Sequence, residues 1–472
     1  MTLISDATIE LAVDDLRGRF RGALLRPGEE GYDEARRIWN GAIDRHPALI
    51  ARCAGADDVV EAVHFARARD LLVTVRGGGH AVAGHAVQDG ALMIDLSLMK
   101  AIRVDARART ARAAGGVLRR ELDAATQAFG LATTGGVISH TGIGGLTLGG
   151  GLGHLMRKHG LTVDNVRSFD VVTADAELLH VDARTEPELF WGLRGGGGNF
   201  GIATAIEYEL HPVGPMVLGG PMFWPLADAP ALLEYLDQAN ADAPDDLGIT
   251  LAMMNAPPLP FLSPERFGTP VVSLVVAWTG DFDEGRRAIE PLRSIGTPLA
   301  DVVGPTPYVV LQSMLDGGAP HGRHYYWKSH RFPRMSEEVL GVLMERMDAM
   351  TSPFCQINGW AMGGAVSRVD PEATAVGERE VGFDVSLIAA WPPSDPEGER
   401  HKQWVRDGWE ALQPHSSGVY ANFISDEGAA GVEAAYGRRL TRLEVLKDRY
   451  DPSNLFRHNA NIRPSRERAA QS

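Results

Sequence analysis

Cysteine is scarce in this sequence, with only Cys53 and Cys355 among 472 residues. Two cysteines cannot build a disulfide framework, and both lie in apolar, strand-like runs where a buried free thiol is expected. No apolar run reaches the length that spans a bilayer, and the first residues lack the basic and apolar regions of a secretory signal. These absences favour a cytoplasmic protein without a membrane partner.

Basic residues are too few to attract polyanions. The formal net charge is -15, and no block of lysine or arginine offsets it, so nucleic acid is not an expected partner. With 44% hydrophobic and 23% charged residues, the composition is that of a globular protein. A chain of 472 residues is too long for one hydrophobic core, so two domains are expected. No metal site is predicted, and the oligomeric state stays open.

Glycine, in contrast, is concentrated in loops. The apolar run 71–75 leads into three consecutive glycines, Gly77 to Gly79, and then presents His80. Because glycine lets the backbone approach a ligand closely, this stretch indicates a cofactor loop that carries a nucleophilic imidazole. A second glycine-dense segment covers 133–153. Backbone N–H groups in such loops form concave anion sites, so two loops together suggest an extended ligand that bears phosphate.

The glycines have competing interpretations. A triple glycine also occurs in tight turns, and His80 could be an ordinary loop histidine. A nicotinamide site on the run 149–153 is another alternative. It fits poorly, because no clear strand enters this run and no acidic residue follows it as a dinucleotide fingerprint requires.

Hydrophobic periodicity divides the chain into two parts that meet at 211–215, and together they indicate an α+β fold. In the first part we expect helices over 32–40, 57–69 and 117–129, strands over 49–53, 72–75, 92–96, 169–173 and 202–210, and a hairpin over 101–114. In the second part we expect strands over 251–254, 271–278, 324–330, 356–362 and 383–391, and helices over 231–239, 337–347 and 432–450. Alternation in the later strands predicts a mostly antiparallel sheet with one wet or ligand-lined face.

Five segments occur in one order along the chain and carry a resemblance to a known family: 76–80, 142–153, 189–202, 420–423 and 450–462. Together they resemble FAD-linked oxidases of the berberine bridge enzyme-like branch of the vanillyl-alcohol oxidase/p-cresol methylhydroxylase superfamily, bacterial members above all. The resemblance covers nearly the whole chain. It implies an FAD-binding domain formed by residues 1–212 and 418–472. A substrate-binding domain with a large antiparallel sheet is implied for residues 213–417.

The resemblance matches His80 to the residue that links covalently to the flavin. A neutral imidazole can add to the electrophilic 8α carbon and a protonated one cannot, so His80 should be unprotonated at that step. The bond tethers the cofactor and is expected to raise its reduction potential. Many relatives add a second link through a cysteine, but Ile138 stands at that position here. One covalent bond is therefore predicted, with a less oxidising flavin than in doubly linked relatives.

Other cofactor contacts are also implied by the resemblance. Loop backbones should hold the pyrophosphate and the isoalloxazine edge, and tail residues should close over the flavin. For Arg76 a structural ion pair is an equal alternative to a phosphate contact. Thr141 is small and close to the expected flavin edge, which leaves access for O2 as the expected acceptor. The full set is Arg76, Gly77, Gly78, Gly79, Ser139, Thr141, Gly142, Gly145, Gly150, Gly153, Asn165, Val166, Ile202, Tyr420, Asn422 and Asn459.

The catalytic base is not where the resemblance would put it. Several relatives use a tyrosine directly after the tail asparagine, and this chain has Phe423 there. Alternation over 324–328 puts Tyr326 and Lys328 on one face, where the lysine could lower the pKa of the phenol. A solvated edge strand explains the same pattern equally well. Tyr420 is a second candidate base, with cofactor packing as the competing role.

The strand over 356–362 supplies further pocket candidates. Asn358 could orient a substrate, although an amide cannot act as a base. Met253, Met254, Trp360 and Met362 suggest an apolar or aromatic substrate, and a buried core explains such residues more often.

These features predict an FAD-dependent oxidoreductase. It would take a hydride from a small organic alcohol, amine or phenolic compound, and O2 would reoxidise the flavin. Two alternatives remain: a dehydrogenase that uses another acceptor, and a flavin-binding protein without turnover. The missing tyrosine at position 423 favours the latter, while His80 favours catalysis.

Overall fold

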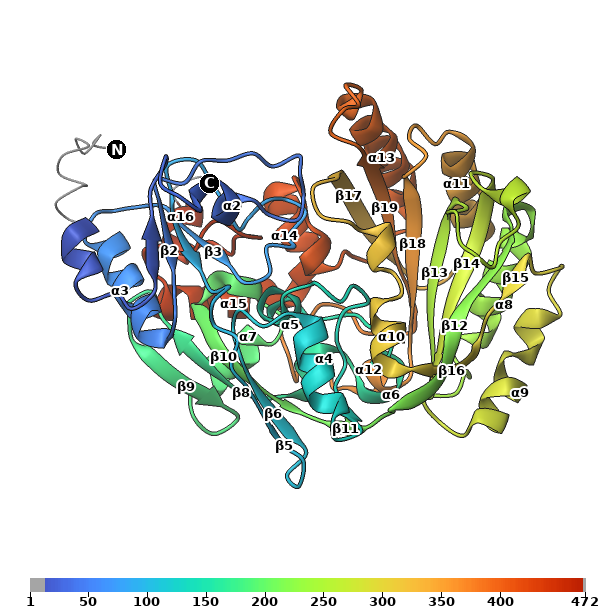
Figure 1. Cartoon of the computed structure of the whole chain (residues 1–472), viewed down its shortest axis with the longest axis horizontal. Helices are drawn as coiled ribbons and strands as arrows, with labels where there is room; N and C mark the ends of the chain where they lie inside the picture. The colour runs from blue at the N-terminus through green and yellow to red at the C-terminus, as the bar shows by residue number, and fades with distance from the viewer. Residues whose placement is uncertain (1–12, 470–472) are drawn as a thin grey trace.

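The structure, a computed structural model, describes residues 13–469. Two domains lie side by side, with the first part of the chain and its C-terminal tail in one and the middle of the chain in the other (Figure 1). Within residues 13–469, no helix has the length and apolar surface that a bilayer-spanning segment requires. Cys53 and Cys355 are both buried and free, as predicted.

A mixed four-stranded sheet carries the first glycine loop. Strands β2 (Leu49–Arg52) and β3 (Val73–Arg76) both run parallel to β4 (Leu92–Asp95) and lie on either side of it. Helix α3 (Ala56–Arg67) carries the chain from the end of β2 back to the end of the sheet where β3 begins, which makes β2 and β3 parallel. Val59 and Val63 of α3 pack into the core of this sheet. The glycines and His80 therefore follow the C-terminal end of a parallel strand. The strand order is β1 (Ala23–Leu25), β2 (Leu49–Arg52), β4 (Leu92–Asp95) and β3 (Val73–Arg76).

A five-stranded antiparallel sheet completes the first domain. The predicted hairpin over 101–114 is confirmed as its outer pair of strands. Three helices accompany this sheet: α4 (Arg119–Gln127), α5 (Ile143–Leu148) and α7 (Pro187–Leu193). The strand order is β5 (Ile102–Asp105), β6 (Thr110–Ala114), β10 (Ile202–Glu209), β8 (Val166–Val172) and β9 (Leu178–Asp182).

The C-terminal tail returns to this domain. Tyr436 and Leu446 share one hydrophobic core with Phe169 and Ile206 of the five-stranded sheet. The single helix predicted over 432–450 is wrong, because Gly437 takes a φ of +49° and interrupts it. The tail instead forms α14 (Gly428–Tyr436) and α15 (Leu440–Tyr450).

The second domain is built on one large antiparallel sheet, as predicted. Strand β12 was not predicted, because Gly219, Gly220 and Pro221 interrupt its apolar pattern. The strand order is β15 (Ala300–Asp301), β12 (Met216–Pro225), β14 (Pro270–Trp278), β13 (Leu247–Asn255), β18 (Gln356–Met362), β19 (Gly382–Trp391) and β17 (His324–Phe332), and β16 (Gly304–Pro307) also pairs with β12.

Four helices cover one face of this sheet. The covering helices contribute apolar side chains to a single core with alternate residues of the strands. They are α8 (Ala229–Ala239), α9 (Phe282–Arg293), α11 (Glu337–Asp348) and α13 (Gly398–Leu412). The opposite face carries the other alternate residues and turns toward the first domain (Figure 1).

Candidate active site

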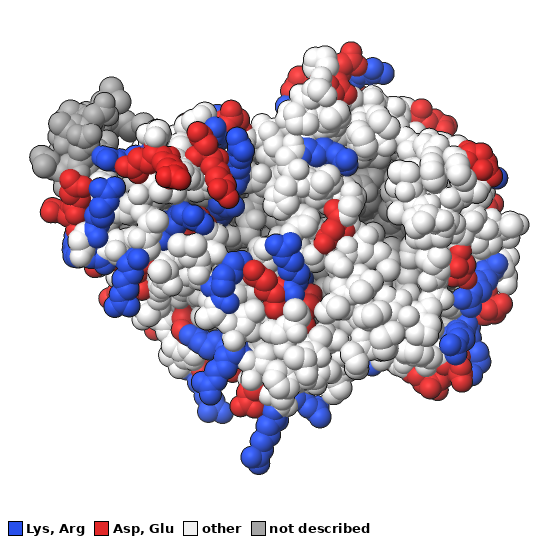
Figure 2. All heavy atoms as spheres, viewed as in Figure 1, with Lys and Arg blue, Asp and Glu red and all other residues white. Residues whose placement is uncertain are grey.

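One cavity of about 1100 Å³ joins the two domains. It extends from the glycine loops of the first domain to the face of the large sheet opposite the four covering helices. In Figure 2 the surface is hollowed between the two halves of the molecule. No Asp, Glu or Lys lines this cavity within the described residues, and Arg323 is the one arginine there. The cavity therefore suits a ligand that does not need a carboxylate group of the protein to bind it.

The two glycine loops meet at the cavity wall. A Cβ on Gly78 would overlap the backbone of Gly142, and a Cβ on Gly142 would overlap Gly78, so only glycine permits this approach. Gly145 and Gly198, in contrast, have free space at the position of a side chain. A Cβ on either of these residues would meet nothing within 4 Å, although both line the cavity. Their bare backbone therefore leaves open space for a ligand.

His80 lies at the edge of this cavity. Its Nε2 is 3.2 Å from Nδ1 of His140, and the ring of Trp39 stacks on it at 4.3 Å. Burial lowers the pKa of His80 to about 3, and the nearby His140 and His321 add to this effect. The imidazole is thus neutral near pH 7, as nucleophilic attack on a flavin requires.

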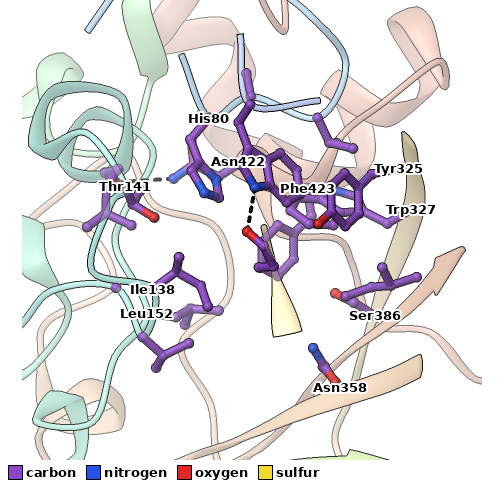
Figure 3. Close-up of a pocket in the computed structure, with 18 of the residues that line it drawn as sticks. His80, Ile138, Thr141, Leu152, Tyr325, Trp327, Asn358, Ser386, Asn422 and Phe423 are labelled. Atoms are coloured by element: carbon purple, nitrogen blue, oxygen red, sulfur yellow. Dashed lines mark hydrogen bonds between the residues drawn. The ribbon is translucent and has the colours of Figure 1, made fainter. Parts of the chain in front are cut away.

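An aromatic wall follows from His80 toward the sheet. Trp39 also stacks on Tyr325 at 3.9 Å. Phe423 packs against Trp327 and Trp360, with 5.4 Å between ring centroids in each pair. In Figure 3 Phe423, Tyr325 and Trp327 lie close together beside His80. The wall can hold a flat apolar or aromatic molecule.

Two members of this wall, Trp39 and Tyr325, are not among the predicted site residues. Trp39 was assigned to a helix over 32–40, but α2 (Tyr32–Arg36) ends early because Arg37 is extended. Trp39 is therefore free to stack on His80. Tyr325 lies on the face of β17 (His324–Phe332) opposite to that of the predicted Tyr326. Tyr325 and Trp327 of β17 line the cavity, and no local pattern distinguishes their face of the strand from the other face.

Unpaired polar groups on the sheet border the cavity. Asn358 of β18 stands opposite Ser386 of β19. The Oδ1 atom of Asn358 and the hydroxyl of Ser386 are buried without a hydrogen-bond partner, and so are the indole nitrogens of Trp327 and Trp360. Buried polar atoms are rarely left unpaired, so these four can bind a ligand. Asn358 and Ser386 lie on the sheet side of the pocket in Figure 3.

Comparison with known proteins agrees with this arrangement. A family model described as FAD binding domain matches residues 47–182, and another described as berberine and berberine like matches residues 419–463. An FAD-linked oxidoreductase of Dictyostelium discoideum is 31% identical over 457 residues, which cover 96% of this chain and 97% of that protein. (R)-6-hydroxynicotine oxidase of Paenarthrobacter nicotinovorans is 31% identical over 462 residues, with 94% and 97% covered. The chain belongs to the berberine bridge enzyme-like FAD-linked oxidoreductases.

Solved structures share the fold of this oxidoreductase. The crystal structure of 6-hydroxy-D-nicotine oxidase from Arthrobacter nicotinovorans matches with a TM-score of 0.84 at 29% identity, covering 94% of this chain and 98% of that one. A berberine bridge enzyme variant matches with a TM-score of 0.85 at 20% identity, covering 96% and 99%. The predicted family, the two-domain α+β fold and the enzyme class are thereby confirmed.

The cavity of the oxidoreductase fits the FAD that this family binds. The open faces of Gly145 and Gly198 provide room beside the backbone. Asn459 donates to the Gly198 carbonyl at 3.2 Å, while its own Oδ1 is buried without a partner. The predicted FAD contacts that line the cavity are His80, Gly77, Gly78, Gly79, Thr141, Gly142, Gly145, Ile202, Tyr420, Asn422 and Asn459.

Tyr420 ties the tail of the oxidoreductase to the second glycine loop. Its hydroxyl accepts hydrogen bonds from the Gly151 N–H at 2.6 Å and from Asn422 at 2.9 Å. Burial raises the pKa of Tyr420 to about 12. The phenol is therefore protonated near pH 7. This arrangement supports the cofactor-packing role of Tyr420 and argues against its role as a base.

The predicted base role of Tyr326, with Lys328 lowering its pKa, does not agree with the structure, because neither residue lines the cavity. They share one face of β17, as alternation predicted, but that face belongs to the core with α13. The Tyr326 hydroxyl donates to Asp426, and Lys328 forms ion pairs with Asp426 at 2.6 Å and Glu427 at 2.9 Å. Burial raises the pKa of Tyr326, although Lys328 opposes it. Neither residue can reach a substrate in the cavity.

Some predicted FAD contacts also lie outside the cavity wall. Arg76 donates to the Ala35 carbonyl at 2.6 Å and lies 3.7 Å from Asp95. These contacts agree with the structural ion pair that was the alternative to a phosphate contact. Ser139 bonds to Asp316 through its backbone N–H at 2.8 Å and its hydroxyl at 2.6 Å.

The other predicted contacts outside the wall have structural surroundings. Asn165 donates to the carbonyls of His159 and Leu161. The side chain of Val166 belongs to the core of the first domain. Gly150 faces the ring of Tyr420, and Gly153 fits closely against the Gly135 carbonyl. These residues shape the loops and do not face the ligand space.

Proposed function

We propose that this oxidoreductase carries FAD on His80 through a single covalent bond and oxidises small, uncharged organic molecules with an apolar or aromatic body. The substrate gives a hydride to the flavin, and O2 is the final acceptor. One observation carries this proposal: a single cavity connects the glycine loops and His80 with the unpaired polar groups of Asn358 and Ser386. A cofactor and a substrate can therefore meet inside it.

The lining of the cavity favours an amine among the alcohol, amine and phenolic substrates. FAD supplies the two-electron acceptor when it is bound. An alcohol must also lose its O–H proton to a base, and no Asp, Glu or Lys of the described chain lines the wall. Burial lowers the pKa of His85 in the wall to about 4 and also lowers that of His458, which weakens both as bases. A neutral amine can lose a hydride without a base, because the nitrogen lone pair stabilises the developing cation. The similar (R)-6-hydroxynicotine oxidase is named for 6-hydroxynicotine, whose aromatic ring would suit the wall at Trp327 and Phe423.

We also propose which domain binds FAD and which domain binds the substrate. Residues 1–212 and 418–472 would bind FAD, since the tail helices share the core of the first domain. Residues 213–417 would bind the substrate, since they contain every strand of the large sheet. The two buried free cysteines fit a reducing compartment, and we place the protein in the cytoplasm.

Anaerobic mixing tests the proposed reaction. The purified protein is mixed with aromatic secondary amines, with the corresponding alcohols, and with carboxylated analogues of both. We expect the uncharged amines to bleach the flavin absorbance fastest, and readmitted O2 to restore it with one peroxide for each flavin. Bleaching by carboxylated analogues alone would contradict the substrate class. Reoxidation by dyes without peroxide would identify a dehydrogenase, and no bleaching by any compound would favour a binding protein.

A further inference from the structure

We propose that His140 is the base that accepts a proton from His80 while His80 bonds to FAD. The inference rests on the covalent link proposed above and assigns a role to a second residue in forming it. His140 would thus be needed once in the life of each molecule and not in each turnover.

The contact between the two rings is direct. Nε2 of His80 lies 3.2 Å from Nδ1 of His140, and the ring centroids are 5.0 Å apart. The side chain of His140 is buried, with 8% of its surface exposed. Its neighbour Ser139 is anchored to Asp316 by two hydrogen bonds. The second glycine loop therefore holds this imidazole in place beside the first loop.

The proposed transfer requires one of the two tautomer pairs that the contact between Nε2 of His80 and Nδ1 of His140 allows. In this pair His140 carries its proton on Nε2 and presents the lone pair of Nδ1 to His80. His80 donates from Nε2, and its own Nδ1 carries the nucleophilic lone pair.

This hydrogen bond matches the proton balance of the attachment. The methyl carbon of FAD would lose a proton and gain a bond to Nδ1 of His80, and the Nε2–H of His80 would become acidic as that bond forms. His140 accepts the Nε2 proton and later releases it. The two electrons would pass to O2, which takes up the methyl proton and the Nε2 proton to form hydrogen peroxide. Atoms and electrons therefore balance with O2 as the one added oxidant.

The groups that face His140 keep it available as a base. Burial lowers the pKa of His140, and His321, whose ring centroid is 4.7 Å away, acts in the same direction. Arg120 also lowers this pKa, while Asp316 and the Ala319 backbone oppose the shift. The ring thus starts neutral. Among residues 13–469 no group of three or more His, Cys, Asp or Glu residues could hold a metal ion.

Covalent attachment can be timed directly in the full-length protein. The protein is produced in riboflavin-depleted cells and mixed with FAD. Flavin that survives denaturing electrophoresis reports the covalent product, and quenching of FAD fluorescence reports reversible binding. The variants are His140→Asn, which keeps a hydrogen-bond acceptor without basicity, and His140→Ala. The matched control is His321→Asn, which removes a neighbouring ring but leaves the bond between His80 and His140.

We expect His140→Asn to bind FAD but to attach it about a hundredfold more slowly or worse, in the range typical of a lost general base. Added imidazole should accelerate attachment in His140→Ala, because the vacated space admits a diffusible base. His321→Asn should attach FAD at close to the wild-type rate.

Three results would contradict the inference. Attachment by His140→Asn at the wild-type rate would overturn the inference, because a residue without basicity would then suffice. An unchanged rate in His140→Ala without imidazole would also overturn it. If the wild-type protein itself released all its flavin, the covalent link would be wrong and this role would fall with it. The imidazole response compares one variant with itself, so impaired folding of that variant cannot mimic rescue.

Discussion

Ser386 of β19 and Ser329 of β17 stand directly opposite each other, and only Ser386 lines the cavity. Both side chains are buried, and both hydroxyls lack a hydrogen-bond partner. Ser386→Ala should therefore reduce kcat/KM by about two- to tenfold, the effect of one neutral hydrogen bond. Ser329→Ala serves as the matched control and should leave kcat/KM unchanged. Steady-state kinetics with the best amine substrate checks this pair, and equal losses in both variants would place the substrate elsewhere.

Gly145→Ala separates FAD binding from folding. Gly145 lies inside α5, and its added Cβ would meet nothing within 4 Å. Alanine favours a helix over glycine, so the apoprotein should be as stable as wild type or more stable by up to about 1 kcal/mol. Bound FAD, however, would occupy the same space, so FAD affinity should fall. Thermal unfolding and titration of FAD fluorescence measure the two effects.

Gly341→Ala is the control for this change, because Gly341 lies on α11 and a Cβ there also meets nothing within 4 Å. It should gain helix stability without any loss of FAD affinity. If Gly145→Ala bound FAD as tightly as this control, the cofactor would not pass over Gly145.

His80→Ala should abolish covalent flavin but retain reversible FAD binding, because the glycine loops remain. Acid precipitation should then release all flavin into the supernatant, whereas the wild-type pellet should stay coloured and yield one flavin-bearing peptide that contains His80. The flavin of the variant should also be less oxidising in equilibrium with redox dyes. His64→Ala, on the exposed face of α3, is the control and should behave as wild type. Flavin retained by His80→Ala would identify another attachment site.

Asp384 should make stability depend on pH. This carboxyl on β19 is 2% exposed, and burial raises its pKa to about 7 despite the opposing charge of Arg331. Between about pH 4 and pH 7 the folded protein therefore holds a proton that the unfolded chain releases, so stability falls as pH rises and then levels off. The full effect is about 4 kcal/mol at most.

Asp384→Asn should remove this slope, since an amide does not titrate. Melting temperatures measured across this pH range would show a flatter profile and a gain in stability near neutral pH. Asp242→Asn, at an exposed position, should retain the wild-type profile. A wild-type slope in Asp384→Asn would assign the pH dependence to another group.

Local chemistry made part of the site predictable. Glycine has no Cβ and imidazole has a lone pair, and both properties belong to the residue itself. The run from Gly77 to His80 therefore indicated a cofactor loop, and the alternation over 356–362 predicted a pocket position for Asn358, which lines the cavity. The order of motifs also indicated the family, which the comparisons confirm.

Other features depended on contacts between distant segments. Alternation shows that Tyr326 and Lys328 share a face of β17, but the packing of α13 decides that this face is buried in the core and that Tyr325 and Trp327 face the cavity. His140 comes 60 positions after His80 and meets it only because the two glycine loops touch. Periodicity reports which side chains point the same way along one strand, whereas the surroundings of that face, and the pKa values they set, come from elements far away in the chain.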